Sequence, residues 1–345
     1  MSAPRPPAAL IVVVLAVALA ASCVISLAFG SEPLPLPDVW RVVAARITGG
    51  TADPTYDAIV WDLRAPRSLL AAVAGAGLAV AGAGMQTLVR NPLADPYLLG
   101  VSSGASVGAT AVMTTGVLSG LGVWALSGGA LLGALAASAL VYAIAMAQGG
   151  LTPLRLVLTG VVLSSAFSAI ASFLVFLSND PRAAQSVLYW LLGSVAAATW
   201  ELLPLAAVVT LAAVLAMAAA SRWLDALAAG PDLAASLGVP VGALRTALFV
   251  GLAVLVGVLV AVSGGIGFVG LVVPHLARMV VGARHRVVVP VAALAGGLFL
   301  VWVDVLARVC VRPQEIPLGV VTGLVGAPVF LLLVGRRHYR YSGSR

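Results

Sequence analysis

The sequence predicts an all-α membrane protein with about ten transmembrane helices. Of its 345 residues, 61% are hydrophobic and 9% are charged, against roughly 25% charged in ordinary soluble domains. Apolar runs recur along the whole chain, most of them near the roughly 20 residues that an α-helix needs to cross a bilayer. We therefore expect a single transmembrane domain over residues 1–345.

The apolar runs place ten spans, taken in chain order. They lie near residues 10–29, 68–88, 97–114, 121–147, 156–177, 199–220, 246–263, 268–281, 287–309 and 317–335. The first is interpreted as a retained span and not a cleaved signal peptide, because many more spans follow it. The third and eighth are short and interrupted by glycine or proline, so neither is expected to cross alone. Broken helices are tolerated at membrane depth only inside protein or along a cavity, which implies a cavity here.

The arginines predict the orientation of the chain. All 19 basic residues are arginine, and the formal net charge is +7. An even number of spans puts both termini on one side. The C-terminal run of Arg336, Arg337, Arg340 and Arg345 indicates that this side is the cytoplasm. No basic stripe with interleaved aromatic residues accompanies the charge, so the sequence gives little support to nucleic-acid binding.

Residues 221–245 form the longest interruption of apolar sequence in the second half of the chain. Two short helices are expected there, over residues 224–229 and 231–237, because Gly230 ends the first, Pro231 begins the second and Gly238 ends it. The segment has two interpretations. It is either a structured connection between spans or a docking surface for a cytoplasmic partner.

Three arginines lie at the predicted outer ends of spans, against the general bias of arginine towards the cytoplasm. Arg64 and Arg67 have helical spacing, so both can face one direction. They are either headgroup anchors or contacts for a partner. Arg308 follows Asp304 by four residues. It either contacts a partner or forms an ion pair with Asp304 within one helix.

Two turns are predicted on the cytoplasmic side. Prolines at 92 and 96 break the helix after Asn91, and this turn is a candidate constriction in a pathway. Thr152 and Pro153 form a tight turn on the same side. The glycines at 100, 104 and 108 line one face of the following helix, for which close packing is the favoured use.

The sequence carries no signature of catalysis and little that would couple transport to an ion gradient. There is no Walker A loop, HExxH or GxSxG motif, and the spans lack the acidic groups of proton- or sodium-driven carriers. His275 has no second ligand at metal-binding spacing. Both cysteines, Cys23 and Cys310, are interpreted as buried free thiols. Energy is therefore expected to enter from outside the chain, and residues 221–245 are the place where it could do so.

From residue 63 to 335 the chain resembles the FecCD-type permeases of bacterial ABC importers, which take up iron-siderophore complexes, haem or cobalamin. The matching blocks are LRAPRSL, GMQTLVRNPLADPYLLGVSSGA, YWLLGS, ASLGV, GGIGFVGLVVPHLARMVVGARHR, DVLAR and EIPLGVVTGLVGAPVFLLLV. The resemblance implies the type II ABC importer architecture: a ten-span homodimer in the bacterial plasma membrane, two cytoplasmic ATPase subunits and an extracytoplasmic binding protein. The chain itself binds no cofactor, since the partner subunit uses the ATP.

The resemblance also assigns roles to residues. Those expected to dock the binding protein are Arg64, Arg67 and Arg308; those expected to form the cytoplasmic gate are Asn91, Leu93, Thr152 and Pro153; those expected to couple to the ATPase are Pro231, Asp232, Ala234, Ser236, Leu237 and Gly238. One position departs from the family pattern, which has an acidic residue directly after the first glycine. Here Pro231 follows that glycine and Asp232 comes next, so the role of the acid is left open.

The cargo expected from family frequency is an iron(III)-siderophore complex, with haem or cobalamin as alternatives. Two other classes of function are compatible with the same sequence. One is a receptor subunit that senses the binding protein without moving cargo, and the other is a secondary carrier. An ATPase that co-purifies with the chain supports import, and its absence supports the receptor; uptake abolished by an uncoupler but not by ATP depletion supports the carrier.

Overall fold

The structure, a computed structural model, describes residues 7–178 and 180–341, with side chains described as far as residue 332. The described residues are helical and contain no strand. Arg345 lies outside them, as do the side chains of Arg336, Arg337 and Arg340, on which the predicted orientation rests.

One apolar helix occupies each predicted span. These helices are α1 (Ala8–Ser26), α4 (Ala65–Leu88), α5 (Val101–Thr115), α6 (Trp124–Ala147), α7 (Pro153–Leu177), α9 (Leu203–Ala219), α12 (Val241–Ser263), α13 (Val269–Val281), α14 (His285–Val309) and α15 (Leu318–Tyr341). Within the described residues, six helices are long and apolar enough to cross a membrane, or up to seven if the bent pair α9 and α10 counts as one span. At 15 and 13 residues, α5 and α13 confirm that the third and eighth segments are short.

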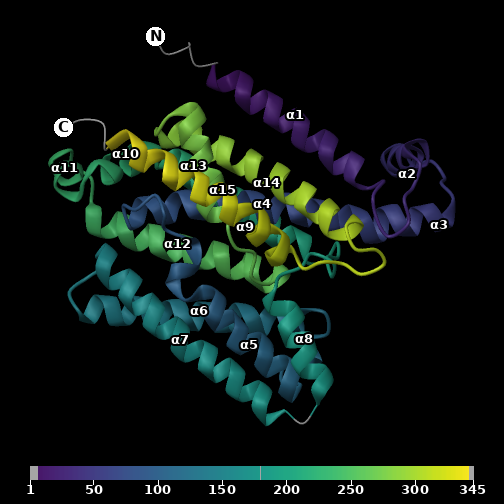
Figure 1. The fold of residues 1–345 in the computed structure, drawn as a ribbon, viewed down its shortest axis with the longest axis horizontal. Helices are drawn as coiled ribbons and strands as arrows, with labels where there is room; N and C mark the ends of the chain where they lie inside the picture. Colours follow the sequence, from purple (N-terminus) through teal and green to yellow (C-terminus); the bar gives the residue numbers. More distant parts are fainter. Residues whose placement is uncertain (1–6, 179, 342–345) are drawn as a thin grey trace.

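The helices form layers around α4 (Figure 1). α5, α6 and α7 make one layer; α12 lies between this layer and the group of α4, α9 and α14; and α1 runs along the outer side of α14. Most of α4 is buried because it contacts helices on several sides. A Cβ on its Gly75 would lie 2.2 Å from the carbonyl oxygen of Gly296, and one on Gly82 would lie 1.8 Å from that of Gly270. Glycine thus lets α4 meet α14 and α13 backbone to backbone.

The glycines of α5 also serve packing, as predicted. A Cβ on Gly108 would lie 1.9 Å from the carbonyl oxygen of Gly129, and one on Gly104 would lie 2.5 Å from that of Gly133. Gly100 has a different use. With φ +72° it ends η2 (Pro96–Leu99) in the left-handed region, where a side chain is strained.

The polar segment between the first two spans folds into a small cap. It consists of α2 (Leu36–Thr48), α3 (Pro54–Asp57) and η1 (Ala58–Arg64), a π-helical stretch that continues into α4. Val39, Val42 and Val60 bury their side chains against Leu27 in a core separate from the main one. The remaining short helices are η3 (Ser119–Leu121), α8 (Pro181–Leu191), α10 (Ser221–Ala229) and α11 (Pro231–Ser236).

The two cysteines are free thiols, but their predicted burial is wrong for one of them. Cys23 is half-buried in α1, whereas Cys310 is exposed because it follows the last residue of α14.

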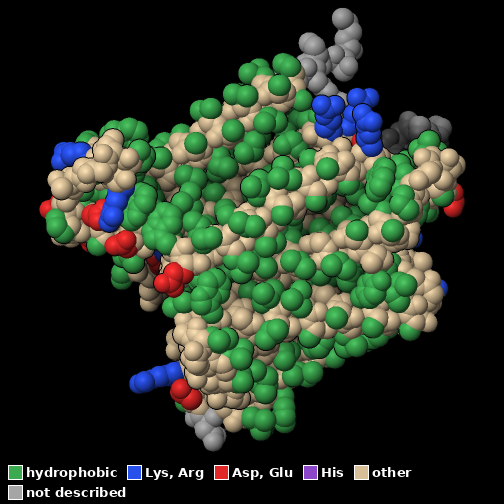
Figure 2. Space-filling view, turned by 180° about the vertical axis from the view of Figure 1, so that it is seen from behind, with side chains coloured by type: hydrophobic (Ala, Val, Ile, Leu, Met, Phe, Trp, Pro, Cys, Tyr) green, Lys and Arg blue, Asp and Glu red, His purple; other side chains and the backbone are tan. Residues whose placement is uncertain are grey.

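Charge is concentrated at two ends of the molecule. Figure 2 shows arginine and acidic side chains at both ends of the face in view, separated by a broad band of hydrophobic and uncharged atoms. The cap of α2 and α3 lies at one end and α10 and α11 at the other (Figure 1). Such a band between two charged ends is the surface that a membrane-spanning protein presents to lipid. α1 begins and α15 ends towards the end that carries α10 and α11, as an even number of spans requires.

Candidate translocation and coupling sites

The segment predicted to couple to a partner folds as two short helices, here called the coupling unit (residues 221–238). α10 continues from α9 after a bend of 67° and begins at Ser221, three residues before the predicted start. Gly230, with φ +150°, separates it from α11, which begins at Pro231 as expected. The N–H groups of Gly238 and Val239 bond to the carbonyl oxygens of Ala235 and Ala234 at 2.9 and 3.0 Å and terminate the unit.

The coupling unit is anchored by some side chains and presents others to solvent. Leu224, Leu227 and Ala234 are buried against the body of the protein. Leu233 of the second helix and Leu237, which directly follows that helix, are 50% and 65% exposed. The other predicted coupling residues, Asp232, Ser236 and Gly238, are exposed, and Pro231 is half-buried. Two exposed leucines on a rigid helical corner form an apolar contact surface of the kind used for protein partners.

The two predicted gate turns lie at the same end of the molecule as the coupling unit (Figure 1). Asn91 Oδ1 accepts a hydrogen bond from the N–H of Leu93 at 2.9 Å and so fixes the first turn, with both residues exposed. In the second turn, Thr152 precedes α7 and Pro153 is its first residue. No hydrogen bond joins the two turns within the part of the chain that the structure describes.

Three of the sequence blocks meet at one junction. The N–H groups of Leu318 and Gly319 both bond at 2.9 Å, to the carbonyl oxygens of Gly193 and Leu192. A Cβ on Gly193, which has φ +73°, would lie 2.5 Å from the carbonyl oxygen of Gly265. The residues just after α8, just before α13 and at the start of α15 are therefore held together through glycine backbone.

The non-helical segment before α13 has backbone hydrogen-bond partners inside the protein, as expected for a broken helix. The hydroxyl of Tyr97 accepts from the N–H of Ile266 at 2.8 Å and donates to its carbonyl oxygen at 3.0 Å. Tyr97 follows Asp95, whose carboxylate accepts from the Tyr97 N–H at 2.8 Å and caps η2. The break thus depends on a side chain from the segment between α4 and α5.

A polar cavity of about 430 Å³ opens beside this break. It is lined by Asp95, Tyr97, Leu98, Gly160, Val161, Ser164, Ser165 and Ser168. Gly160 allows the close approach, since a Cβ there would lie 1.8 Å from the carbonyl oxygen of Leu98. Burial raises the pKa of Asp95 to about 6. The hydrogen bond from the Tyr97 N–H has the smaller, opposite effect, because it stabilises the carboxylate and lowers the pKa. The serines give the exposed face of α7 weak polar groups.

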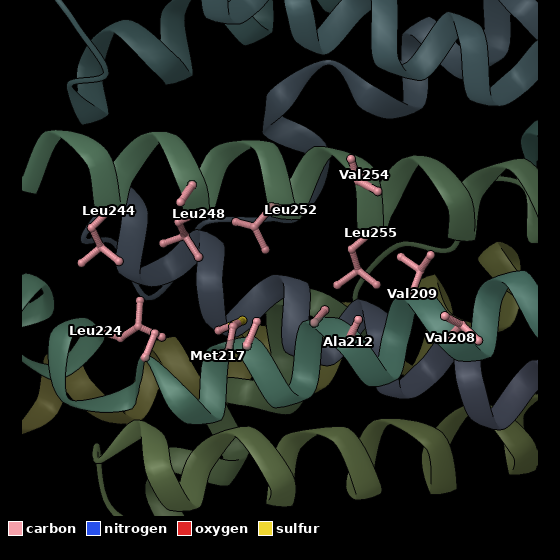
Figure 3. Close-up of a pocket in the computed structure, with 15 residues that line it drawn as sticks. Val208, Val209, Ala212, Met217, Leu224, Leu244, Leu248, Leu252, Val254 and Leu255 are labelled. Carbon is pink, nitrogen blue, oxygen red and sulfur yellow. The ribbon is translucent and has the colours of Figure 1, made fainter.

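A second cavity, of about 460 Å³, is a groove between α9 and α12 (Figure 3). Leu244, Leu248 and Leu252 line it from α12, and Met217 faces them from α9, while Leu224 of α10 closes one end. Its lining is apolar throughout and includes none of the predicted gate residues. The groove suits hydrocarbon and has no polar group with which to orient a ligand.

The structure brings the three predicted docking arginines together near the cap, in what we call the arginine cluster. Asp304 lies between two of them, with Oδ1 2.9 Å from Arg67 and Oδ2 2.9 Å from Arg308. Arg67 also pairs with Glu315 at 2.8 Å. Arg64 donates instead to the carbonyl oxygens of Leu27 and Glu32 at 2.8 and 2.6 Å.

These contacts are internal to the chain. Arg64 and Arg308 are 8% and 4% exposed, and the side chain of Arg67 is 11% exposed. The ion pair between Asp304 and Arg308 confirms the alternative that the sequence offered for Arg308. The contacts of Arg67 with Asp304 and Glu315, 237 and 248 residues away, carried no sequence signal beyond the presence of acids at the same predicted end.

The layered apolar helices, the internally hydrogen-bonded breaks and the two charged ends define a polytopic membrane protein. A model of the FecCD transport family matches residues 17–336, and the chain belongs to that family. It is the membrane-spanning permease of an ABC importer and not an enzyme, and a separate ATPase hydrolyses the ATP.

Known relatives and a solved structure resemble the chain over most of its length. It is 40% identical to the cobalamin import permease BtuC of Halobacterium salinarum, covering 90% of this chain and 82% of that one. It is 35% identical to the molybdate import permease MolB of Haemophilus influenzae, covering 91% of each. A solved structure, an inward-facing conformation of a metal-chelate-type ABC transporter, superimposes with a TM-score of 0.83 at 34% identity and covers 94% of this chain and 99% of that one.

Proposed function

We propose that the chain imports an iron(III)-siderophore complex across the bacterial plasma membrane into the cytoplasm. In this proposal two copies form the pathway, two ATPase subunits bind at the coupling units, and a binding protein delivers cargo at the opposite end. Both termini are then cytoplasmic. The observation that carries the proposal is the coupling unit, which presents exposed Leu233 and Leu237 at the same end as the gate turns.

Transport follows from movement of the coupling units. When ATP draws the two ATPase subunits together, the paired units move with them, and the two permease copies tilt. The pathway is then exposed to one side and afterwards to the other, with Asn91, Leu93, Thr152 and Pro153 closing the cytoplasmic side. The serines of α7 and the carboxyl of Asp95 contact cargo weakly, because tight binding to the permease would hinder release.

The proposed cargo is a metal chelate, and haem and cobalamin are its alternatives. Support comes from the overall match to a metal-chelate-type transporter. Cargoes as different as cobalamin and molybdate are named for relatives of similar identity. The binding protein is therefore proposed to read the identity of the cargo.

The cargo is tested with liposomes that contain the permease and its ATPase, supplied with the cognate binding protein. Iron(III)-siderophore, haem and cobalamin are offered in turn. We expect uptake of the iron(III)-siderophore complex, and uptake of haem or cobalamin alone would replace it as cargo. Docking of the binding protein without uptake of any of the three would favour the receptor subunit.

For the arginine cluster we propose docking of acidic residues on the binding protein. The cluster contains three arginines and two carboxylates, and its excess positive charge attracts an acidic surface at long range. Direct contact with the guanidinium groups requires the internal pairs to open, since Arg67 and Arg308 already donate within the chain.

Docking is tested by the affinity of the binding protein for the purified permease. Arg64→Gln removes one positive charge without breaking an ion pair, since Arg64 bonds to backbone oxygens. We expect weaker binding at low salt and a smaller loss of affinity on adding salt. Arg41→Gln is the control, because it removes an exposed arginine that pairs with Asp38 and is not part of the arginine cluster. Equal affinities for wild type and Arg64→Gln at low salt would refute the docking role.

A further inference from the structure

Three side chains connect the coupling unit to the helices behind it. Oδ1 of Asp225, in α10, lies 2.6 Å from Nδ1 of His285, the first residue of α14. The same oxygen accepts the backbone N–H of His285 at 2.9 Å. Nε2 of His285 lies 2.7 Å from Oγ1 of Thr87, near the end of α4. α10, α14 and α4 are therefore joined in series.

The carboxylate fixes the donor at one end of the series; at the other end, the Thr87 hydroxyl lies within hydrogen-bond distance of both His285 Nε2, at 2.7 Å, and the carbonyl oxygen of Ala83, at 2.9 Å. A carboxylate only accepts hydrogen bonds, so Nδ1 of His285 carries a proton and donates to Asp225. Asp225 also caps the N-terminus of α14, where a negative charge is favoured. His285 and Thr87 are 2% and 3% exposed, so water is a poor substitute for either partner.

The series ends next to the first gate turn. Thr87 lies four residues before Asn91, and the N–H of Asn91 bonds to the carbonyl oxygen of Gln86 at 3.1 Å. Arg90, between them, has φ +53° and closes α4. At its other end, α10 leads directly through Gly230 into α11. A displacement of the coupling unit thus has a short route to the turn at Asn91, through hydrogen bonds that are partly buried at Asp225, whose side chain is 39% exposed, and buried at Thr87.

We propose that Asp225, His285 and Thr87 form a mechanical link that carries movement of the coupling unit to the gate turn at Asn91. His285 is a positioning residue that transmits force between helices and does not touch cargo. The inference rests on the proposed function, since it supplies the internal route by which ATPase movement opens the gate.

The test separates coupling from assembly. Thr87→Val removes the hydroxyl at nearly constant volume, and Asp225→Ala removes the acceptor. Thr87→Ser and Asp225→Asn keep an oxygen at each position and serve as conservative variants. Permease, ATPase and binding protein are reconstituted in liposomes, and the number of ATP molecules hydrolysed per cargo molecule imported is measured together with ATPase binding.

We expect Thr87→Val and Asp225→Ala to bind the ATPase normally and to hydrolyse ATP, but to import about fivefold less cargo per ATP or worse, the lower range of common coupling free energies. The conservative variants should behave as wild type. The double variant should be no worse than either single one, because one break already interrupts the series.

Ser68→Ala is the matched control. It removes another buried side-chain hydrogen bond of α4, the 2.7 Å contact with Ser26, at the far end of the same helix. An equal loss of coupling in Ser68→Ala, or an unchanged coupling ratio in Thr87→Val, would overturn the link. If Asp225→Ala does not fold, Thr87→Val and the double variant Thr87→Val with Asp225→Asn decide the matter. A wild-type complex without ATP-driven uptake would refute the proposed function, and the link with it.

Discussion

Asp304 holds two arginines from different helices with a side chain that is 1% exposed. Its two oxygens face Arg67 of α4 and Arg308 of α14, and Arg67 continues to Glu315. A buried charge deprived of its partner costs far more than the pair contributes. The cluster therefore fixes α4, α14 and the residues before α15 to one another, in addition to any role with a partner.

Asp304→Asn should destabilise the protein by about 3–5 kcal/mol, because it leaves two buried guanidinium groups without their shared carboxylate. Asp38→Asn, in an ion pair whose arginine is 76% exposed, should cost roughly 0.2–1 kcal/mol. Unfolding in detergent, followed by circular dichroism, measures both. Similar losses of stability in the two variants would contradict the structural role of the cluster.

Asp95 predicts a pH dependence. Burial raises its pKa to about 6 from the ordinary 3.8, so the folded state holds its proton more tightly than the unfolded state does. The contribution of Asp95 to stability therefore falls as pH rises between these two values and is constant above pH 6 or so. Relative to wild type, Asp95→Asn should gain stability as pH increases from 4 to 6. A constant difference over that range, measured by thermal unfolding, would contradict the raised pKa.

At the scale of elements, the coupling unit separates an anchoring face from a contact face. Leu224, Leu227 and Ala234 pack inward while Leu233 and Leu237 remain exposed. Removing such an apolar pair from water is favourable, and this happens only when a partner covers it. Gly230, with φ +150°, permits the turn between the two helices, and Gly238, with φ +79°, permits the turn that follows the second helix.

Leu237→Asp should weaken ATPase binding and reduce transport in proportion, because it places a charge in the proposed contact while leaving the fold intact. Leu36→Asp is the matched control, since Leu36 is 53% exposed on α2 at the opposite end. Affinity of the purified permease for its ATPase is the measurement. Normal binding by Leu237→Asp would mean that the coupling unit does not dock the ATPase.

The elements differ in how far the sequence predicts them. Long apolar runs specify helices such as α6 and α14, because every apolar side chain in them can be placed in the protein core or in lipid. Gly230, Pro231 and Gly238 specify the coupling unit through their backbone geometry. The helices of the cap were not predicted, since proline and acids obscured a short amphipathic pattern in α2. The early start of α10 was missed because its bend from α9 has no proline or glycine to mark it.

The candidate site shows a similar division. The residues of the turns and of the coupling unit could be predicted, because proline, glycine and asparagine act on the local chain. The partners of Arg67, and the link from Asp225 through His285 to Thr87, could not be. They join residues 60 to 248 positions apart, and only the packing of helices against α4 brings them together.

At the scale of the whole molecule, the two charged ends and the uncharged band between them orient the assembly. The coupling units and the gate turns share one end, and the arginine cluster lies towards the other. In the proposed function, ATPase docking and cargo delivery thus act on opposite ends of one helical body. α4 extends between these ends, with Arg67 near its start and Thr87 near its end.

The most direct test of the account is uptake by liposomes that hold the permease and its ATPase, with cargo-loaded binding protein outside and ATP inside. ATP-driven import predicts uptake that requires ATP and continues in the presence of an uncoupler. Uptake that persists without ATP, or that an uncoupler abolishes while ATP is present, would contradict ATP-driven import, and the second result would favour a secondary carrier.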